Sequence, residues 1–509
     1  MKKLTGLDAS FLSMEGPTTV GHVAGLAIYR RPRADFDPYR EVFDRINAMV
    51  GRLEPLRRRL VEVPFNIDHP YWIEDPDFDL EYHVRELALA PPGAADQLAD
   101  QVARIVGRHL DRSRPLWEAY VIEGLGDDRW ALLWKTHHAA IDGAAGVLLL
   151  NMFTDLEPDA PVLEPVEWTS EPIPSSTDLL TRSVQSLATN PVKGVRLGLK
   201  LARNVADGAG VSSVSGALSQ AQKGVRRLSG QAVPGDSEQR VRMPLSPAPP
   251  TPWNATISAH RRFAMRSTAL ANIKALKDAS GGTLNDVVMA ICTGALRQYL
   301  LDHDALPNKP LRAMVPVSVR TGDEEDPWTN RVSGIIAELP TDLADPLERL
   351  ARCSEAMSEA KKQFDLVPAE TMIDAAQTMS PVVATAATRL ASRLRLADRV
   401  NLPANVTISN VPGPRQPLYF AGAKLDNYIP VSIVTDGMGL NITVHSYLDR
   451  LDFGLIADRE LVPDLWDLVD LHADEVEVLM DATGAAWAEP PRPPAMRKGS
   501  VHVQPVPAR

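Results

Sequence analysis

The hydrophobic pattern of the chain is most informative around a pair of adjacent histidines. An apolar run over residues 130–136 follows a Gly-Asp-Asp turn signal, and this pattern predicts a largely buried β-strand. Residues 143–153 space their apolar side chains as in a buried helix, and Asp142 stands where it can cap the helix N-terminus. His137 and His138 therefore lie where a strand ends and the chain turns.

Similar patterns occur in the second half of the chain. Residues 258–263 are predicted as a strand and residues 268–279 as a helix, and another helix is expected to begin at Thr283. Thr283 is a favourable N-cap, and Asp286 in the first turn suits the positive end of the helix dipole. That structural role alone explains Asp286, whereas the amide of Asn285 is placed to donate a hydrogen bond to an oxyanion.

Clusters of proline mark the expected joints of the chain. They lie in an acidic stretch over residues 157–174, in residues 244–252 and in a tail from residue 489 onward. The predicted division is an N-terminal half (1–155), a connector (156–255), a C-terminal half (256–482) and a disordered tail (483–509).

The connector contains a locally basic segment in a chain whose net charge is −11. Basic residues predominate over residues 181–228, where Asp207 is the single acid. Apolar residues recur there near helical spacing but are interrupted by Pro191 and several glycines, which predicts broken amphipathic helices. Two interpretations remain open: a segment that lies on an anionic bilayer, and a solvated connector that packs on the two halves.

Composition argues against several classes of protein. The chain has 509 residues and 44% hydrophobic content, yet no apolar run approaches the roughly 18 residues of a spanning helix. Its first residues lack a signal-peptide hydrophobic stretch, so a cytoplasmic protein is expected. The negative net charge argues against a nucleic-acid partner. Cys292 and Cys353 are expected to be buried thiols, and Gly413-Pro414 is predicted to turn the chain after a strand.

The two histidines are candidates for acid–base chemistry. Adjacent side chains of an extended chain point to opposite sides, so one of His137 and His138 faces a cleft and the other faces the packing behind it. Neutral imidazole can take the proton that an alcohol loses as it attacks a thioester, and can then protonate the departing thiolate. Asp142 can hold an imidazole or pair with an arginine, and Gly143 leaves room at the start of the next helix.

Two alternatives compete with this interpretation. The spacing of His138 and Asp142 also occurs in zinc sites, but the chain has only 11 histidines and no third ligand cluster nearby, so no metal is expected. The pair can also be two packed structural histidines beside an ordinary helix cap. The longer pattern His-His-x-x-x-Asp-Gly over residues 137–143 favours the catalytic interpretation.

This pattern resembles the signature of the coenzyme-A-dependent acyltransferase superfamily, which includes chloramphenicol acetyltransferase and peptide-synthetase condensation domains. Other segments resemble one branch of it, the bacterial wax ester synthase/diacylglycerol acyltransferase family. They occur in that family's order, from about residue 4 to about residue 482. The segments are residues 4–12, Arg114-Pro115-Leu116-Trp117-Glu118, and residues 283–287, 315–320 and 405–414.

The resemblance implies an α/β fold of two chloramphenicol-acetyltransferase-like halves with the active-site tunnel between them. It assigns the general base to His138, with His137, Asp142 and Gly143 in support, and a second functional motif to Asn285 and Asp286. Acyl-CoA is then a co-substrate, and neither a cofactor nor a metal is expected.

Two more residues are given supporting roles. Arg57 resembles the arginine that pairs with the motif aspartate in condensation domains, and the alternative is a solvent-exposed basic run. Trp117 is expected to pack in the core of the first half, and its motif can also reflect a tunnel wall.

The implied activity is that of a long-chain acyl-CoA-dependent O-acyltransferase, which makes triacylglycerol or wax esters from diacylglycerol or a fatty alcohol. Peripheral contact with an anionic lipid surface, at the inner membrane face or at lipid droplets, is expected. Two alternatives remain: an acyltransferase of the same fold that uses a carrier-protein-bound acyl donor, and a non-catalytic lipid-binding or lipid-droplet protein.

Overall fold

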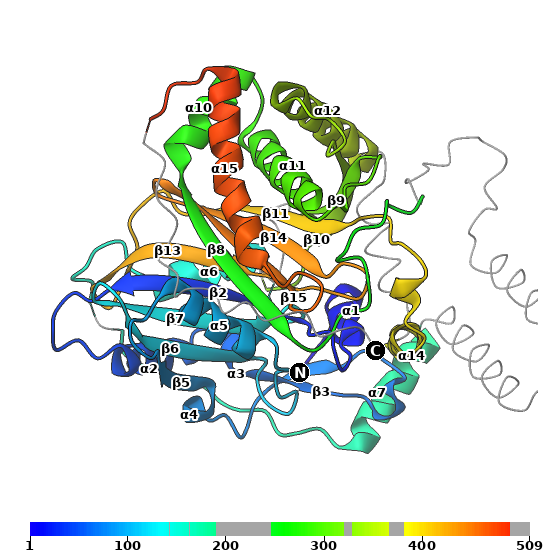
Figure 1. Cartoon of the computed structure of the whole chain (residues 1–509). Coiled ribbons are helices and arrows are strands. Elements are labelled where there is room, and N and C mark those ends of the chain that lie inside the picture. The colour runs from blue at the N-terminus through cyan, green and yellow to red at the C-terminus, as the bar shows by residue number, and fades with distance from the viewer. Residues whose placement is uncertain (142, 162, 190–245, 320–327, 366–380, 489–509) are drawn as a thin grey trace, which may run out of the picture.

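The computed structural model of the protein describes residues 1–141, 143–161, 163–189, 246–319, 328–365 and 381–488. In these residues the chain builds two six-stranded sheets and one three-stranded sheet. Figure 1 shows one large sheet below the other, with a layer of helices over the upper one. Within these ranges, every helix is too short or too polar to cross a bilayer.

The lower sheet is built mainly from the first part of the chain. Its strand order is β12 (Tyr419–Phe420), β13 (Ala423–Val431), β2 (His22–Arg30), β7 (Arg129–His137), β6 (Trp117–Leu125) and β5 (Val84–Ala88). Strands β2, β7 and β6 pair antiparallel, whereas β5 joins β6 in parallel. The strand predicted over residues 130–136 lies within β7 and is confirmed.

Side chains of β2 and β7 alternate between two environments. Leu26 and Leu133 face a core that they share with α5 (Ala95–Val106). On the opposite face, Trp134 and Thr136 point into the space between the two large sheets. This period of two decides which residues at the end of β7 face that space.

The upper sheet belongs to the second half of the chain. Its strand order is β10 (Val332–Leu339), β9 (Leu311–Ser318), β11 (Val406–Pro412), β14 (Leu440–Tyr447), β15 (Arg450–Asp458) and β8 (Arg261–Ala269). Its upper face is covered by α10 (Leu270–Ser280), α11 (Leu284–Asp302), α12 (Pro346–Asp365) and α15 (Leu465–Thr483), as Figure 1 shows. Leu440, Ile442 and Val444 pack in the core beneath these helices, so the alternate residues of β14 face the lower sheet.

The predicted strand at 258–263 and helix at 268–279 lie a little farther along the chain, as β8 and α10. Ser258 precedes the strand because its backbone N–H and its hydroxyl both donate to Asp458, at 2.7 and 2.6 Å. Thr268 remains in the strand because it pairs with β15. Side-chain capping and strand pairing, which the apolar pattern does not encode, set both boundaries.

Other predicted elements are confirmed. Helix α11 begins after Thr283, whose Oγ1 accepts from the backbone N–H of Asp286 at 3.2 Å. The Asp286 carboxylate in turn accepts from the backbone N–H of Thr283 at 2.8 Å, which completes a capping box. The helix predicted over residues 143–153 is α6 (Gly143–Phe153), and Gly413 follows the end of β11.

The remaining elements are short or peripheral. They are β1 (Lys2–Lys3), α1 (Gly6–Met14), α2 (Pro38–Val50), α3 (Glu54–Arg57), β3 (Arg58–Val61), η1 (Pro64–Asn66), β4 (Tyr71–Glu74), α4 (Leu80–His83), α7 (Ser176–Thr189), α14 (Pro381–Arg393) and η3 (Leu396–Asp398). Strands β1, β4 and β3 form the small sheet. Helix α1 packs against α14, so the N-terminal segment contacts the second half directly.

A strand from the second half closes one edge of the lower sheet. β13 pairs antiparallel with β2, where Pro430 stands opposite Gly25. β13 also lies against β15, because a Cβ on Gly454 would stand 1.9 Å from the carbonyl oxygen of Pro430. The buried Asp452 of β15 accepts from the backbone N–H of Tyr428 at 3.2 Å. The two halves predicted from the sequence therefore share a sheet.

Candidate active site

The two histidines of the motif point to opposite sides of the chain. His138 continues the side of β7 that carries Thr136 and Trp134, and with them it lines a cavity between the large sheets. His137 is buried behind the strand, where its Nε2 lies 3.2 Å from Oε1 of Glu15. The cavity thus receives the side chain of His138 and not that of His137.

Contacts with two distant segments hold the ring of His138. The ring of Phe11, from α1, stacks on it with 4.0 Å between centroids and 10° between planes. Nδ1 of His138 lies 3.0 Å from Oδ1 of Asn330. Nδ2 of Asn330 donates to the carbonyl oxygen of His138 at 2.6 Å and to Oδ1 of Asp8 at 2.7 Å.

These contacts decide which nitrogen of His138 carries the proton. The carbonyl oxygen of His138 can only accept, so the amide nitrogen of Asn330 must face it. Oδ1 of Asn330 therefore faces Nδ1 of His138, which must donate. In the neutral imidazole the lone pair is then on Nε2, as a general base requires.

Asp8 holds Asn330 in place from the protein interior. Its Oδ1 also accepts from the backbone N–H of Asn330 at 3.2 Å, and its Oδ2 accepts from the hydroxyl of Thr5 at 2.7 Å. Burial raises the pKa of Asp8, and the hydrogen bonds from Thr5 and Asn330 offset this only in part. A chain of hydrogen bonds thus runs from a buried carboxyl group to the cavity.

His137 contacts an ion pair between Glu15 and Arg112 behind the strand. Glu15, which contacts its Nε2, also accepts from Arg112 at 2.6 Å and from the backbone N–H of Gly21 at 3.0 Å. Burial alone raises the pKa of Glu15, but His137 and Arg112 hold it well below its ordinary value. A Cβ on Gly21 would stand 2.5 Å from Nε2 of His137, so only glycine fits there without movement. This cluster braces the end of β7.

The turn after the histidines leads into α6. Asp142 lies outside the described residues, so its predicted role as a cap or as a partner of a histidine or arginine stays a prediction. Gly143 is the first residue of α6. Arg58, which is buried, reaches this turn and donates to the carbonyl oxygen of Ala140 at 3.4 Å.

The predicted supporting residues of the first half, Arg57 and Trp117, are not part of the cavity lining. Arg57 forms an ion pair with Glu74. Trp117 is buried, donates through Nε1 to the carbonyl oxygen of Leu56 at 2.7 Å, and stacks on Trp134 with 4.9 Å between centroids. Since Trp134 lines the cavity and Trp117 packs behind it, Trp117 supports the wall.

The second predicted motif reaches the cavity through an intermediary. Oδ1 of Asn285 accepts from Nδ2 of Asn410 at 3.3 Å, and it is Asn410, at β11, that lines the cavity. Asp286 caps α11 and accepts from the hydroxyl of Ser354 at 3.2 Å. The oxyanion role of Asn285 stays a prediction.

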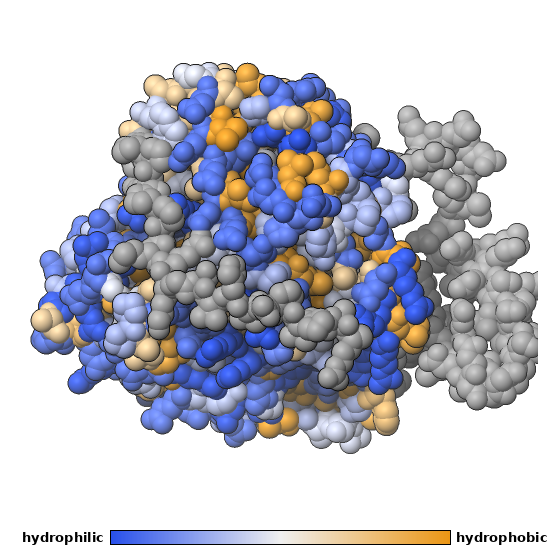
Figure 2. Space-filling model, in the orientation of Figure 1, coloured by the Kyte–Doolittle hydropathy of each residue, from blue (hydrophilic) through white to orange (hydrophobic). Residues whose placement is uncertain are grey.

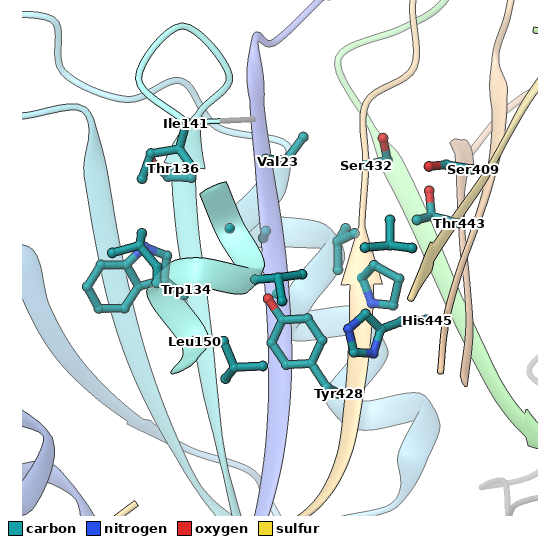
Figure 3. A pocket seen from close by; sticks show the side chains of 18 of the residues that line it. Val23, Trp134, Thr136, Ile141, Leu150, Ser409, Tyr428, Ser432, Thr443 and His445 are labelled. Atoms are coloured by element: carbon teal, nitrogen blue, oxygen red, sulfur yellow. The ribbon is translucent and has the colours of Figure 1, made fainter. Parts of the chain in front are cut away.

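The cavity has a volume of about 510 Å³, which is within the range of small-molecule sites. Its walls differ in chemistry, as Figure 3 shows. The wall from β2, β7 and α6 is mostly apolar and includes Val23, Trp134 and Leu150. The opposite wall presents the hydroxyl groups of Ser409, Ser432 and Thr443.

Both cysteines lie away from this cavity. Cys292 and Cys353 are buried free thiols in the core beneath the helices of the upper sheet, as predicted. Burial raises the pKa of Cys353 to about 12, so its thiolate is scarce at neutral pH.

Reasoning from the sequence missed the residues that orient His138. Asp8 and Phe11 lie in the N-terminal segment that carried the family resemblance, but no chemical role was assigned to either. Asn330 is 192 positions from His138, and no local spacing links the two. Asn330 stands just before the edge strand β10, and a polar residue in such a place gives no signal of its own.

Comparisons with known proteins agree along most of the chain. Residues 4–288 match the family model for the wax ester synthase/diacylglycerol acyltransferase catalytic domain, and residues 328–480 match the model for the WS/DGAT C-terminal domain. The chain is 33% identical, over 487 residues, to a Mycobacterium tuberculosis protein assigned as a diacylglycerol O-acyltransferase. The alignment covers 95% of this chain and 91% of that protein.

Two further matches extend the likeness. The chain is 32% identical over 480 residues to the O-acyltransferase WSD of Acinetobacter baylyi, with 94% of this chain and 97% of that protein covered. The solved structure of a wax ester synthase/diacylglycerol acyltransferase from Marinobacter aquaeolei VT8 matches with a TM-score of 0.66 at 31% identity. That match covers 95% of this chain and 100% of the other, and it confirms the predicted α/β fold with two sheet-containing halves.

Proposed function

Because the chain belongs to the wax ester synthase/diacylglycerol acyltransferase family, we propose that this O-acyltransferase transfers a long acyl chain from acyl-CoA to the hydroxyl of a diacylglycerol or a fatty alcohol. One observation carries the proposal. His138 faces a cavity of about 510 Å³, and its Nδ1 lies 3.0 Å from Oδ1 of Asn330.

The proposed reaction needs no enzyme nucleophile. Nε2 of His138 takes the proton of the acceptor hydroxyl while the hydroxyl oxygen attacks the thioester carbonyl carbon. The tetrahedral intermediate collapses, the carbon–sulfur bond breaks, and the imidazolium of His138 returns the proton to the departing thiolate. Coenzyme A and an ester leave, and His138 is again neutral.

The two walls of the cavity suit the two kinds of group in these substrates. Apolar side chains such as Leu150 favour a long acyl or alkyl chain, since its burial contributes about 0.8 kcal/mol per CH₂ group. Hydroxyl groups such as those of Ser409 and Thr443 can hydrogen-bond to the amides of a pantetheine arm. The comparisons lend no support to a carrier-protein donor or to a non-catalytic lipid-binding role.

A first experiment measures coenzyme A release and ester formation with palmitoyl-CoA and either a diacylglycerol or hexadecanol. His138→Ala is expected to lower the rate by about 10²–10⁴-fold, because the general base is lost. His303→Ala serves as the control, since His303 is exposed at the end of α11. Equal rates in the natural protein and His138→Ala would remove His138 as the base.

We further propose that the enzyme docks on an anionic lipid surface. The basic segment first considered for this contact, residues 181–228, lies mostly outside the described residues. In the described part, a patch at α14, η3 and η1 combines exposed apolar and basic side chains, and Figure 2 shows both kinds of surface over α14 and α7. This lipid-docking patch consists of Phe65, Leu390, Leu394, Val400, Arg389, Arg393, Arg395 and Arg399.

The position of the patch supports this role. The patch contains four arginines. Asp398, the acid of η3 beside them, is paired with Arg395 at 2.7 Å. Apolar side chains flanked by arginines suit the boundary between headgroups and acyl chains of an anionic lipid layer. Helix α14 packs on α1, whose Phe11 stacks on His138, so docking there brings insoluble acceptors near the cavity.

Vesicle flotation tests the docking surface. The double variant Leu390→Asp/Val400→Asp is expected to bind vesicles of phosphatidylcholine and phosphatidylglycerol several-fold less well, while the natural protein binds phosphatidylcholine alone only weakly. Leu347→Asp, at an exposed leucine of α12, is the matched control. Activity on vesicle-embedded dioleoylglycerol is expected to fall with binding, whereas activity on dispersed dioctanoylglycerol is retained. Vesicle binding by the double variant at the level of the natural protein would refute the assignment.

A further inference from the structure

A channel inside the cavity follows β2 away from His138. Alternate residues of that strand line the cavity on the face that β2 shares with β7. Val23 pairs with Thr136, which lies two residues before His138. Ala27 pairs with Leu132, four residues farther along β7. These pairings order the lining residues from the proposed base toward the opposite end of the two strands.

The floor of the channel has little bulk. At Gly25 and Ala27 the strand presents only a hydrogen atom and a methyl group to the cavity. Tyr428 pairs with Ala27 from the neighbouring strand, and its hydroxyl oxygen lies over Gly25, 2.1 Å from where a Cβ would stand. Leu150 of α6 also lines the cavity, and Figure 3 shows it with Tyr428 at the end away from Thr136. The channel therefore runs over β2 between α6 and the ring of Tyr428.

Aromatic rings close the far end of this channel. Tyr29 and Phe420 line the cavity there, and each is 1% exposed. Their ring centroids are 5.8 Å apart, and the buried Trp130 stacks on Tyr29 with 4.7 Å between centroids. A chain that enters from the side of His138 thus meets packed rings at the end of the channel.

The length of the channel suits a long hydrocarbon chain. Along β2 the backbone rises about 13 Å from Val23 to Ala27 and about 20 Å from Val23 to Tyr29. An extended hydrocarbon chain advances about 1.25 Å per carbon at ordinary bond lengths and angles. Starting at Val23, a chain of eight carbons spans about 10 Å and ends before Ala27, whereas one of sixteen spans about 20 Å and passes it.

The acyl chain of the donor fits this channel better than the acceptor does. It is unbranched from the reacting carbonyl carbon onward, whereas a diacylglycerol divides into two chains close to its hydroxyl. On the other side of the thioester, the pantetheine arm can bind the hydroxyl groups of the opposite wall, such as those of Ser409 and Thr443. The two parts of the donor then lie against walls of matching chemistry.

We propose that the channel along β2 is the acyl-chain site, and that Ala27, with Tyr29 and Phe420 beyond it, sets the longest acyl chain that the enzyme accepts. The proposal rests on the proposed function, since it takes acyl-CoA as the donor. Ala27 acts through its small size, because a larger side chain fills the channel and stops the acyl chain short of Tyr29.

Activity as a function of acyl length tests the proposal. With dioctanoylglycerol as acceptor, kcat/KM is measured for octanoyl-CoA and for hexadecanoyl-CoA. Ala27→Leu is expected to lower the ratio of hexadecanoyl to octanoyl use by ten-fold or more. Leucine adds three carbons, and each methylene kept out of an apolar site lowers binding by about four-fold. Ala27→Val, which adds less bulk, covers the case in which the leucine variant does not fold.

Two further variants sharpen the comparison. Ala131→Leu is the matched control, because Ala131 lies on the adjacent strand and packs in the core on the other face of the sheet. It is expected to leave the ratio unchanged even if the protein becomes less stable. Phe420→Leu opens the far end and is expected to raise the use of eicosanoyl-CoA relative to hexadecanoyl-CoA several-fold.

An unchanged ratio in both Ala27 variants would overturn the proposal. So would a shift that appears only when the length of an alcohol acceptor is varied, since the channel would then hold the acceptor. Failure of the proposed function would be distinct: the natural protein would form no ester with either donor. Thermal denaturation with the two acyl-CoAs then still tests the channel. Greater stabilisation by hexadecanoyl-CoA, lost in Ala27→Leu, supports it, and equal stabilisation refutes it.

Discussion

His138 can act as a base only while its proton stays on Nδ1, so the proposed catalysis depends on residues that need not touch the substrate. Asn330 accepts from Nδ1, and Asp8 holds Asn330 from the interior. Phe11 fixes the plane of the ring. The group that takes the proton and the groups that orient it are therefore distinct, and substitutions distinguish them.

Asn330→Ala is expected to lower kcat by about 10²-fold or more, because an imidazole in the wrong tautomer loses up to roughly 10⁴-fold. The KM for the donor is expected to change little. Nitrogen-15 NMR of labelled histidine reports the tautomer of His138 directly, and a mixture of tautomers is expected in the variant. A fall in kcat with the tautomer unchanged would contradict the positioning role of Asn330.

The sequence located the proposed base but not the residues that orient it. The histidine pair was recognisable because its motif is contiguous over residues 137–143. Asp8 and Asn330 stand 322 positions apart and meet only because α1 and the segment before β10 come together in the fold. Such a contact depends on tertiary packing, which periodicity and local spacing do not encode.

At the scale of elements, the end of β7 depends on a close approach to the chain before β2. Gly21 lies against His137, and the Glu15 carboxylate binds both the backbone of Gly21 and Arg112. The size of the residue at position 21 therefore controls the packing of the strand end that carries His138, the proposed base.

Gly21→Ala is expected to lower the free energy of unfolding by about 1–3 kcal/mol, the usual effect of overpacking a tight site. Urea denaturation measures it. Gly16→Ala is the matched control, since no atom lies within 4 Å of a Cβ at that nearby position, and it is expected to stay within about 0.5 kcal/mol of the natural protein. Equal effects of the two substitutions would show that the contact with His137 is unimportant.

Elements with a strong local signal were predicted well. The strand over 130–136 and the helix over 143–153 have clear periodicity and turn signals, and Thr283 is a favourable N-cap for α11. The start of β8 and its boundary with α10 were misplaced, because the hydrogen bond from Ser258 to Asp458 decides the first and the pairing of Thr268 with β15 decides the second. Neither contact is local.

At the scale of the whole molecule, the two sheets are joined through a buried carboxylate. Asp452 accepts from the hydroxyl of Ser267 at 2.5 Å and from Nδ2 of Asn427 at 2.9 Å, and also contacts the backbone of Tyr428. Burial outweighs these hydrogen bonds and raises its pKa from 3.8 to about 6. The junction between β13 and β15 thus contains a group that titrates in mildly acidic solution.

This raised pKa predicts how the stability depends on pH. Because the folded pKa exceeds the unfolded one, the contribution of Asp452 is fully present below about pH 4 and is lost as the pH rises through about 6. Relative to Asp452→Asn, the natural protein is expected to lose about 2 kcal/mol of unfolding free energy between pH 4 and pH 7. Urea denaturation of both proteins from pH 4 to pH 7 measures the difference, and a constant difference would contradict the prediction.

The sequence predicted two halves, and the family comparison supports a fold of that kind. The sequence did not predict that β12 and β13, from the second half of the chain, would complete the sheet of the first half. An edge strand with alternating residues fits either sheet equally well, so its partner is decided by the connections on both sides and by the close approach of Gly454 to Pro430.

The pairing of β13 with β2 has a consequence for synthesis on the ribosome. β2 is complete early, but the strand that covers its edge follows only after most of the chain, roughly 20–80 s later at 5–20 residues per second. Until then the nascent chain presents an open strand edge, which invites pairing with neighbouring chains. The yield of active enzyme in a cell therefore depends on keeping the open edge of β2 from pairing with neighbouring chains during translation. A chaperone can cover this edge, and slow recruitment of the next ribosome keeps neighbouring nascent chains apart.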